Sequence, residues 1–207
     1  ELMKELTPEV DLMTVRGSAL GEYEPVTYGS KTLEFCDLVG AEPFFAKDPW
    51  TLRLEGKKVL VIHPFDKTIP AQYEKRELLF PGKNIMPKFT LIMQKAVQTM
   101  CFTKDERFSD WFDALEYMYN EAMKKDFDVA IIGCGAYGFP LAAKIKRAGK
   151  IALHLGGFTQ LLFGIKGARW ENAQEYYRKM LDNPAWVRPS SEEIPQNFKD
   201  IENGAYW

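Results

Sequence analysis

Residues 133–138, with the sequence GCGAYG, have the glycine spacing of a phosphate-binding turn. The segment FDVAII over 127–132 predicts a buried strand before the turn. Residues 140–150 predict a helix after it, and 151–155 predict the next strand. A glycine turn between a strand and a helix lets backbone N–H groups approach a phosphate at the helix N-terminus. The turn therefore predicts a phosphate or nucleotide site. A tight turn that serves only helix–strand packing is the alternative.

The strand that follows the turn argues against a dinucleotide cofactor. In dinucleotide enzymes this strand ends in an Asp or Glu that binds the ribose hydroxyl. Here residues 151–155 are followed by Gly156 and Gly157, and no carboxylate occurs before Gln160. We therefore expect neither NAD nor S-adenosylmethionine, while another phosphate-bearing ligand remains open.

Both histidines of the chain lie at or near the carboxyl ends of predicted strands. His63 ends the apolar run over 59–62, and His154 lies in the strand over 151–155. The carboxyl ends of parallel strands meet at the edge of a sheet where ligands bind. An imidazole there can transfer a proton or contact a phosphate near neutral pH. His63 and His154 are the candidate catalytic residues, with histidines held by backbone groups as the alternative.

Further polar residues and glycines near these strand ends are candidates for binding a nucleotide or phosphate. Lys166 and Arg169, in a loop that two glycines make flexible, are suited to a diphosphate, and Trp170 to stacking on a base or sugar. A solvated helix face and, over 163–170, a surface hairpin with a packing tryptophan are the alternatives. The predicted binding set is Gly133, Gly135, Tyr137, Gly138, Gly156, Gly157, Gln160, Thr68, Gln72, Arg76, Lys166 and Arg169.

The elements that would position these residues alternate between strand and helix. The pattern predicts strands over 59–62 and near 91–93, with a helix over 93–100 as an alternative to the latter, and a short strand over 33–39. It predicts helices over 69–80, from Ser109 or Asp110 onward, and over 159–163. The helix after Asp110 has an apolar stripe that predicts core packing: Trp111, Phe112, Leu115, Met118, Tyr119 and Ala122. We expect an α/β fold with a Rossmann-like, doubly wound, mainly parallel sheet and helices on both faces.

Composition and length limit the classes of function. The 207 residues divide into an N-terminal flank over 1–50, an α/β domain over 51–183 and an extended tail over 184–207 that docks on the domain. The flank is expected to be incomplete because the chain starts at Glu1 rather than Met. A net charge of -2 gives no reason to expect nucleic acid, and no apolar run reaches the ~20 residues of a membrane helix.

The cysteines predict a reduced, cytoplasmic setting. Cys36, Cys101 and Cys134 are odd in number, lie far apart and form no C-x-x-C pair. Cys134 lies within the glycine turn, where we interpret it as a small residue rather than a nucleophile, because no base is evident beside it.

Several of these segments together resemble a bacterial family of largely uncharacterised proteins often found near surface-polysaccharide genes. The segments are KKVLVIHPF at 57–65, GCGAYG at 133–138, HLGG at 154–157 and FGIKGARW at 163–170. The resemblance covers about residues 40–207. Its layout is similar to that of the GT-D-type glycosyltransferases, whose last strands carry a comparable glycine turn and a strand that ends in a glycine pair.

The resemblance implies a glycosyltransferase that uses a nucleotide-sugar donor, a glycan or lipid-linked acceptor and a divalent metal, manganese or magnesium. Self-association into a homo-oligomer stays open. GT-D enzymes place an Asp-x-Glu metal motif near the N-terminus after an Arg-x-Gly-like turn. Here Glu22 and Glu24 have the carboxylate spacing without that turn. The motif is therefore expected upstream of Glu1 or is lacking. A non-catalytic nucleotide-binding or assembly module of the same fold is the alternative.

Overall fold

A four-stranded parallel sheet forms the centre of the computed structural model, which describes residues 1–15, 28–99 and 104–207. The strands are β3 (Lys58–His63), β4 (Thr90–Lys95), β5 (Val129–Ile132) and β6 (Ile151–His154). They are arranged in the order β4-β3-β5-β6, and each neighbouring pair is parallel. The strands predicted near 59–62, 91–93, 127–132 and 151–155 are confirmed, and β4 includes residues 93–95, the first part of the segment for which a helix was the alternative.

The two central strands are buried on both faces of the sheet, as a continuous apolar run requires. Successive side chains of a strand point to opposite faces. Val59 and Val61 of β3 therefore enter one hydrophobic core, while Leu60 and Ile62 enter the other. The side chains of these four residues are fully buried.

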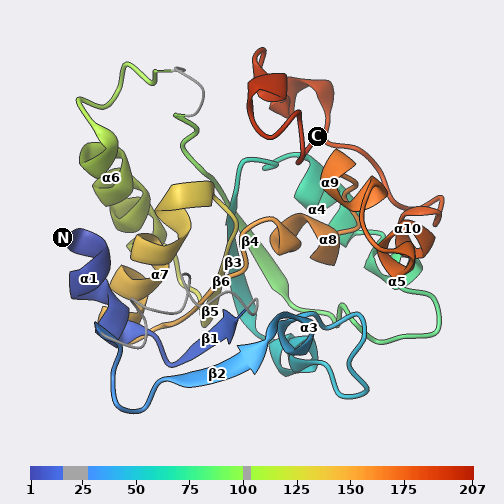
Figure 1. Cartoon of the computed structure of the whole chain (residues 1–207), viewed down its shortest axis with the longest axis horizontal. Helices are drawn as coiled ribbons and strands as arrows, with labels where there is room; N and C mark the ends of the chain where they lie inside the picture. Colours follow the sequence, from blue (N-terminus) through green and yellow to red (C-terminus); the bar gives the residue numbers. More distant parts are fainter. Residues whose placement is uncertain (16–27, 100–103) are drawn as a thin grey trace.

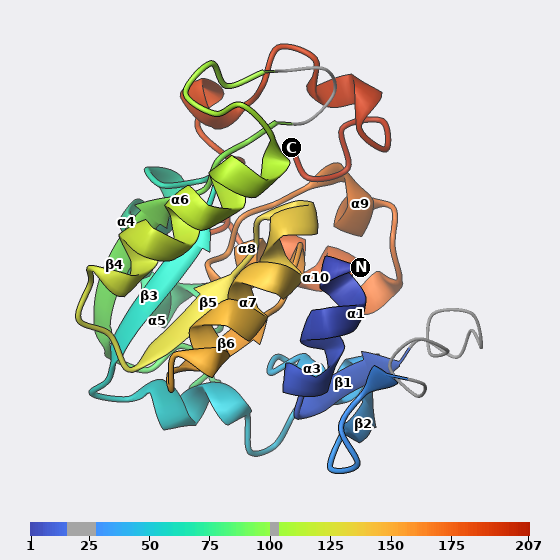
Figure 2. The ribbon, with the colours of Figure 1, turned by 90° about the vertical axis from the view of Figure 1, so that its left-hand side faces the viewer.

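Helices cover both faces of the sheet. On one face lie α6 (Trp111–Met123) and α7 (Gly138–Arg147), which bury residues such as Met118 and Leu141. On the other face lie α4 (Thr68–Tyr73), α5 (Arg76–Leu79), α8 (Phe158–Leu162) and α10 (Glu175–Leu181). Figure 1 shows these two sets on either side of the sheet, and Figure 2 shows α6 and α7 lying across one face. The α/β class with a parallel sheet between helices is confirmed.

Helix α6 begins where the capping residue predicts. The carboxylate of Asp110 accepts a hydrogen bond from the N–H of Asp113 at 2.9 Å, as an N-cap residue does.

Leu115 and Met118 of the apolar stripe predicted for this helix are buried. Phe112 is 57% exposed, so its assignment to the core was wrong. It lies next to Trp111 on the margin of the stripe and points toward solvent.

Other elements differ from their predictions in extent. The helix predicted over 69–80 is divided into α4 and α5, because Lys75 leaves the helical conformation with φ -101° and ψ 13°. The strand predicted over 33–39 is shortened to β2 (Glu34–Asp37), which pairs in parallel with β1 (Leu12–Val15) in a separate two-stranded sheet. The remaining helices of the described residues are α1 (Leu2–Leu6), α3 (Leu38–Ala41) and α9 (Ala168–Glu171), with 3-10 turns at Thr7–Glu9, Trp50–Leu54, Gly135–Tyr137, Ser191–Glu193 and Phe198–Asp200.

The tail over 184–207 packs against the sheet-and-helix body through aromatic residues. Trp186 and Trp207 are buried in the same core as α4 and α8. Glu193 is buried as well and binds residues at the start of α4.

Among the described residues, the helices are too short or too polar to span a membrane.

Candidate functional site

A cavity of about 470 Å³ lies at the carboxyl ends of β3, β5 and β6. After β3 the chain forms the outer strand β4 and then returns past β3 to form β5, so the strand order reverses between β3 and β5. Ligands of parallel α/β sheets bind in the crevice outside such a reversal. Small-molecule pockets enclose roughly 300–1,000 Å³, and this cavity falls within that range. Its lining residues are His63, Pro64, Phe65, Val97, Gln98, Gly133, Cys134, Gly135, His154, Gly156, Gly157, Gln160, Ile201, Glu202, Tyr206 and Trp207.

The glycine turn brings unpaired backbone donors to this cavity. Gly133 still donates its N–H to the Ile62 carbonyl at 3.0 Å, as part of the strand ladder. In the described part of the chain, no backbone carbonyl accepts from the N–H groups of Cys134 and Gly135. Gly135 has a φ of +58°, and the turn then enters α7. The N–H groups at the start of a helix lack partners within the helix and favour an anion.

Some of the glycines are needed for close packing. For those positions this supports the alternative that the glycine turn serves the packing of helix and strand. A Cβ atom on Gly133 would lie 2.6 Å from Thr159 Oγ1 and 2.7 Å from His63 Cδ2. A Cβ atom on Gly138 would lie 2.2 Å from the His154 ring. Gly138 therefore makes room for His154, and Gly133 makes room for both Thr159 and His63.

His63 is buried at the end of β3 and is neutral. Its side chain is 3% exposed, and its Nδ1 atom accepts the N–H of Phe65 at 3.0 Å. Burial lowers the pKa of His63 to about 3, although Glu193 acts in the opposite direction. Since Nδ1 is an acceptor, the proton of the neutral ring is on Nε2. His63 is therefore a hydrogen-bond donor rather than a free base.

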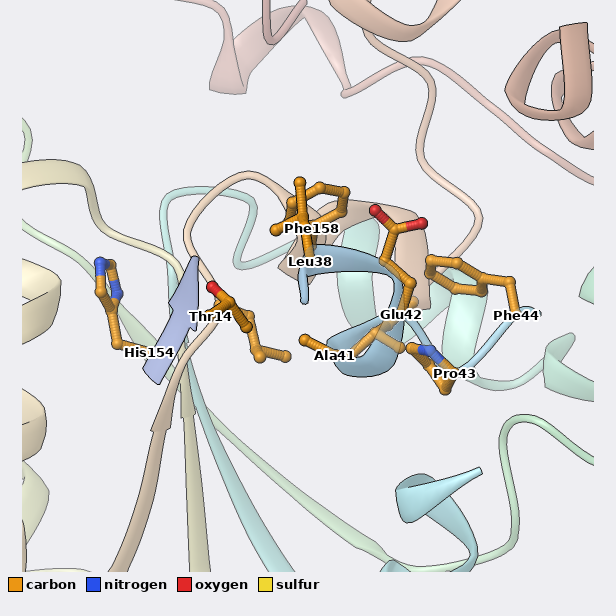
Figure 3. A pocket seen from close by; sticks show the side chains of 10 residues that line it. Thr14, Leu38, Ala41, Glu42, Pro43, Phe44, His154 and Phe158 are labelled. Carbon is orange, nitrogen blue, oxygen red and sulfur yellow. The ribbon is translucent and has the colours of Figure 1, made fainter. Parts of the chain in front are cut away.

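His154 lies at the end of β6 with an exposed side chain. Desolvation by its neighbours lowers the pKa of His154, and the Ile132 carbonyl partly offsets this effect. The ring is therefore neutral at neutral pH. His154 also lines a second pocket of about 60 Å³, which includes Thr14 and Glu42. In the view of Figure 3, Thr14 lies between His154 and Glu42. The carboxylate of Glu42 accepts a hydrogen bond from the Tyr177 hydroxyl.

Buried polar atoms without a hydrogen-bond partner occur beside the cavity. Gln98 and Trp207 line it, and in the described residues Gln98 Nε2 and Trp207 Nε1 have no partner. Thr159 Oγ1, which faces Gly133, has none either. A buried polar atom without a partner costs about 1–3 kcal/mol. Such atoms are expected at a site that a ligand or water completes.

Two predicted binding residues lie within the protein rather than at the cavity. The Tyr137 ring stacks on Trp111 with 4.9 Å between the ring centroids, and its hydroxyl lies 2.6 Å from Thr99 Oγ1. Gln72 donates from Nε2 to the Gly164 carbonyl at 3.2 Å, and to a second carbonyl. Both side chains hold elements together.

Thr68 and Arg76 are also used internally. The hydroxyl of Thr68 donates to Glu193 and accepts the N–H of Ser190 at 3.0 Å. The guanidinium of Arg76 lies 5.2 Å from the centroid of the Tyr73 ring. Neither residue is part of the cavity lining.

The loop over 163–170 forms neither a wall of the cavity nor the surface hairpin that was the alternative. Ile165 forms an isolated parallel bridge to Val187, and the loop then enters α9. Trp170 is buried, which supports its reading as a packing residue. Lys166 donates its N–H to the Val187 carbonyl at 2.7 Å and is not part of the cavity lining.

Arg169 and Gln160 connect the C-terminal segment to the cavity. Arg169 pairs with Glu202, and its guanidinium lies 4.7 Å from the centroid of the Tyr206 ring. Gln160 lines the cavity and donates from Nε2 to the Tyr206 carbonyl at 3.2 Å. Neither this segment nor Gln98 was predicted from the sequence to contribute site residues. The aromatic end of a polar tail was the available signal for the segment.

The residues at the cavity do not fit a divalent cation. In the described residues, no group of three or more His, Cys, Asp or Glu side chains could hold a metal. Glu202 is paired with Arg169, and His63 Nδ1 accepts a backbone N–H. Glu22 and Glu24, which have the carboxylate spacing of a metal motif, lie outside the described residues.

Cys134 is a buried thiol in the lining of the cavity. Burial raises the pKa of Cys134 to about 12, so the thiolate is absent at neutral pH. Because the thiolate is the nucleophilic form, Cys134 acts as a small packing residue.

The glycine turn, the neutral histidines and the C-terminal segment thus meet at one cavity. No protein-family model, curated protein or solved structure matches this chain.

Proposed function

We propose that the cavity binds a nucleotide-sugar and that the protein is a glycosyltransferase acting in the synthesis of a surface polysaccharide or another glycoconjugate. One observation carries the proposal: the cavity lies where the strand order reverses, next to a glycine turn whose N–H groups at Cys134 and Gly135 have no backbone acceptor among the described residues. The strand order also supports describing the fold as Rossmann-like and doubly wound. The acceptor would be a glycan or a lipid-linked glycan, and the setting cytoplasmic.

The charge of the departing diphosphate has to be stabilised when a sugar is transferred. The N–H groups of the glycine turn and the N-terminal end of α7 favour negative charge at this position. His63 supplies a further neutral donor through Nε2. Neutral donors would therefore bind the phosphates, since Lys166 and Arg76 do not line the cavity.

Between the two histidines, His154 is the better candidate for moving a proton to or from a ligand. Its side chain is exposed and borders the cavity, and the lowered pKa keeps its ring neutral. His63 is fully enclosed, and Nδ1 is already used by the Phe65 N–H. In this assignment His63 positions the ligand.

A second candidate function is nucleotide binding without turnover, as in an assembly module. The observation that favours it is the state of the carboxylate at the cavity: Glu202 is already paired with Arg169. The ion pair thus occupies the carboxylate of the cavity lining that a transferase could use as a general base.

Calorimetry with the nucleoside diphosphates and nucleotide-sugars of several bases, with and without manganese, tests both candidates. Binding of at least one nucleotide is expected, and binding of none contradicts both. Gly135→Trp should abolish binding because Gly135 borders the cavity. Gly149→Trp is the matched control: it also has a positive φ and open space around it, but it lies at the far end of α7. Release of nucleoside diphosphate with an acceptor glycan separates transfer from binding alone.

A further inference from the structure

The two walls of the cavity differ in chemistry. The strand-end wall, formed by His63 and residues 133–135, offers backbone and imidazole N–H donors without charge. The C-terminal wall, which we define as Ile201, Glu202, Tyr206 and Trp207, offers a carboxylate, a phenol and an indole N–H. One wall therefore favours an anion, and the other combines donors with acceptors.

We propose that the C-terminal wall recognises the sugar of a nucleotide-sugar while the strand-end wall holds its phosphates. This rests on the proposed function of the cavity. A carboxylate repels a phosphate, so Glu202 directs the phosphates away from its own wall. A sugar hydroxyl both donates and accepts, so it can bind the Glu202 carboxylate and the Trp207 indole N–H.

The C-terminal wall is held in a fixed position by the body of the protein. Arg169 donates its N–H to the Ala205 carbonyl at 2.9 Å, and Gln160 Nε2 donates to the Tyr206 carbonyl at 3.2 Å. The chain passes so close to Gly157 that a Cβ atom there would lie 2.8 Å from Tyr206 Cε1. A wall that is ordered before binding loses little entropy when the ligand arrives.

The backbone at Glu202 adopts a conformation that is uncommon for its residue type. Glu202 has a φ of 45° and Asn203 a φ of 55°, both in the left-handed region. Such residues persist where the surrounding structure fixes them, and they cluster at ligand sites. Here the turn places Glu202 at the cavity and beside Arg169. A carboxylate has about four acceptor positions, so one ion pair leaves room for a hydroxyl.

Trp207 supplies an independent observation. Its side chain is 5% exposed and borders the cavity, and in the described part its Nε1 atom is buried without a partner. An indole N–H is a donor only. A ligand hydroxyl would provide the acceptor that the residues in the described part of the chain do not.

The inference is tested by calorimetry. The quantity compared is the dissociation constant of a nucleoside diphosphate divided by that of its hexosyl ester. Uridine, guanosine and thymidine diphosphates and their hexosyl esters are the probes. Glu202→Gln should weaken binding of the ester about tenfold, the effect of one charge-assisted hydrogen bond. It should leave binding of the diphosphate unchanged or tighter, because a repelling charge is gone. Tyr206→Phe keeps the ring beside Arg169 but removes the hydroxyl. It should also weaken binding of the ester and lower this ratio.

Glu192→Gln is the matched control, since Glu192 lies in the same tail and pairs with Lys67 at an exposed site. It should leave both constants unchanged. Equal weakening of diphosphate and ester in Glu202→Gln, with an unchanged melting temperature, would overturn the inference while the proposed function stands. The inference would also be overturned, with the proposed function intact, if Glu202→Gln and Tyr206→Phe both kept this ratio within twofold of that of the native protein. Failure of the native protein to bind any of the probes would overturn the proposed function and this inference together.

Discussion

At the scale of single residues, His63 combines a position in the cavity lining with a fixed, neutral charge state. The ring is enclosed at the end of β3 and accepts the Phe65 N–H, so the folded protein holds it neutral. Burial lowers its pKa from 6.5 to about 3. The same burial that makes His63 a poor base makes it a dependable donor, because its protonation does not change across the physiological pH range.

This shift predicts a loss of stability in mild acid. The unfolded chain takes up a proton near pH 6.5 and the folded chain only near pH 3, so the free energy of unfolding falls as pH falls through this window. The expected loss from His63 between pH 7.5 and pH 5 is about 2 kcal/mol. The lowered pKa of His154 acts in the same direction. Urea unfolding at several pH values measures the slope.

His63→Asn serves as the comparison, because an amide oxygen can accept the Phe65 N–H without titrating. This variant should show a flatter dependence than the native protein between pH 7.5 and pH 5. Measurements above pH 5 avoid most of the carboxylate titration, which begins lower. Parallel pH profiles for the two proteins would show that His63 is not the titrating group.

At the scale of elements, the tail is tied to the start of α4 by one buried carboxylate. Glu193 accepts the N–H groups of Lys67 at 2.7 Å and Thr68 at 3.1 Å, and also the hydroxyl of Ser190 at 2.9 Å. Burial raises the pKa of Glu193, but the hydrogen bonds from Thr68, Lys67 and Ser190 outweigh this and leave the pKa lowered. The charged form of Glu193 therefore caps the start of α4 and also holds the tail against it.

Glu193→Ala should lower the free energy of unfolding by about 3 kcal/mol, because it removes charge-assisted bonds and leaves buried N–H groups unpaired. Glu192→Ala, one residue earlier, removes an exposed pair with Lys67 and should cost less than about 1 kcal/mol. Urea unfolding followed by fluorescence measures both variants. Similar small losses in the two would contradict a structural role for the Glu193 contacts.

The elements also indicate what the sequence can predict. The apolar runs over 59–62 and, within the predicted strand 127–132, over 129–132 identify central strands, because a strand buried on both faces is apolar at every position. The glycine turn and both histidines then fall at the sheet edge by connectivity alone. The partners of side chains could not be predicted in this way. Gln72 and Arg169 are residue types that bind phosphates, yet Gln72 donates to a backbone carbonyl and Arg169 pairs with Glu202. Such contacts join distant segments, and local patterns do not encode them.

The C-terminal wall escaped prediction for the same physical reason. Nothing in residues 201–207 indicates that Tyr206 approaches Gly157, because this approach depends on how α9 and the tail pack. The glycines that permit it, Gly157 and Gly167, were visible in the sequence. Their partners were not, since a glycine shows that space is needed without showing which residue fills it.

At the scale of the whole molecule, stability is expected to be graded from the sheet outward. Strands β3 and β5 are buried on both faces, whereas β1 and β2 form a small sheet with exposed or partly exposed residues. Local opening free energies follow burial and packing. The site combines both extremes, because the strand ends belong to the rigid centre and the C-terminal wall belongs to a tail without regular strands.

Native-state hydrogen exchange followed by mass spectrometry should resolve this gradient. Peptides over 58–63 and 129–132 should exchange most slowly, and those over 12–15 and 34–37 among the fastest of the strands, because their amides open without disrupting the central sheet. Adding a nucleotide-sugar should slow exchange over 133–138 and 201–207 together, since the ligand would touch both walls. Peptides of β1 and β2 are the internal control and should not change. Slowing at 133–138 alone would place the ligand on the strand-end wall without the tail.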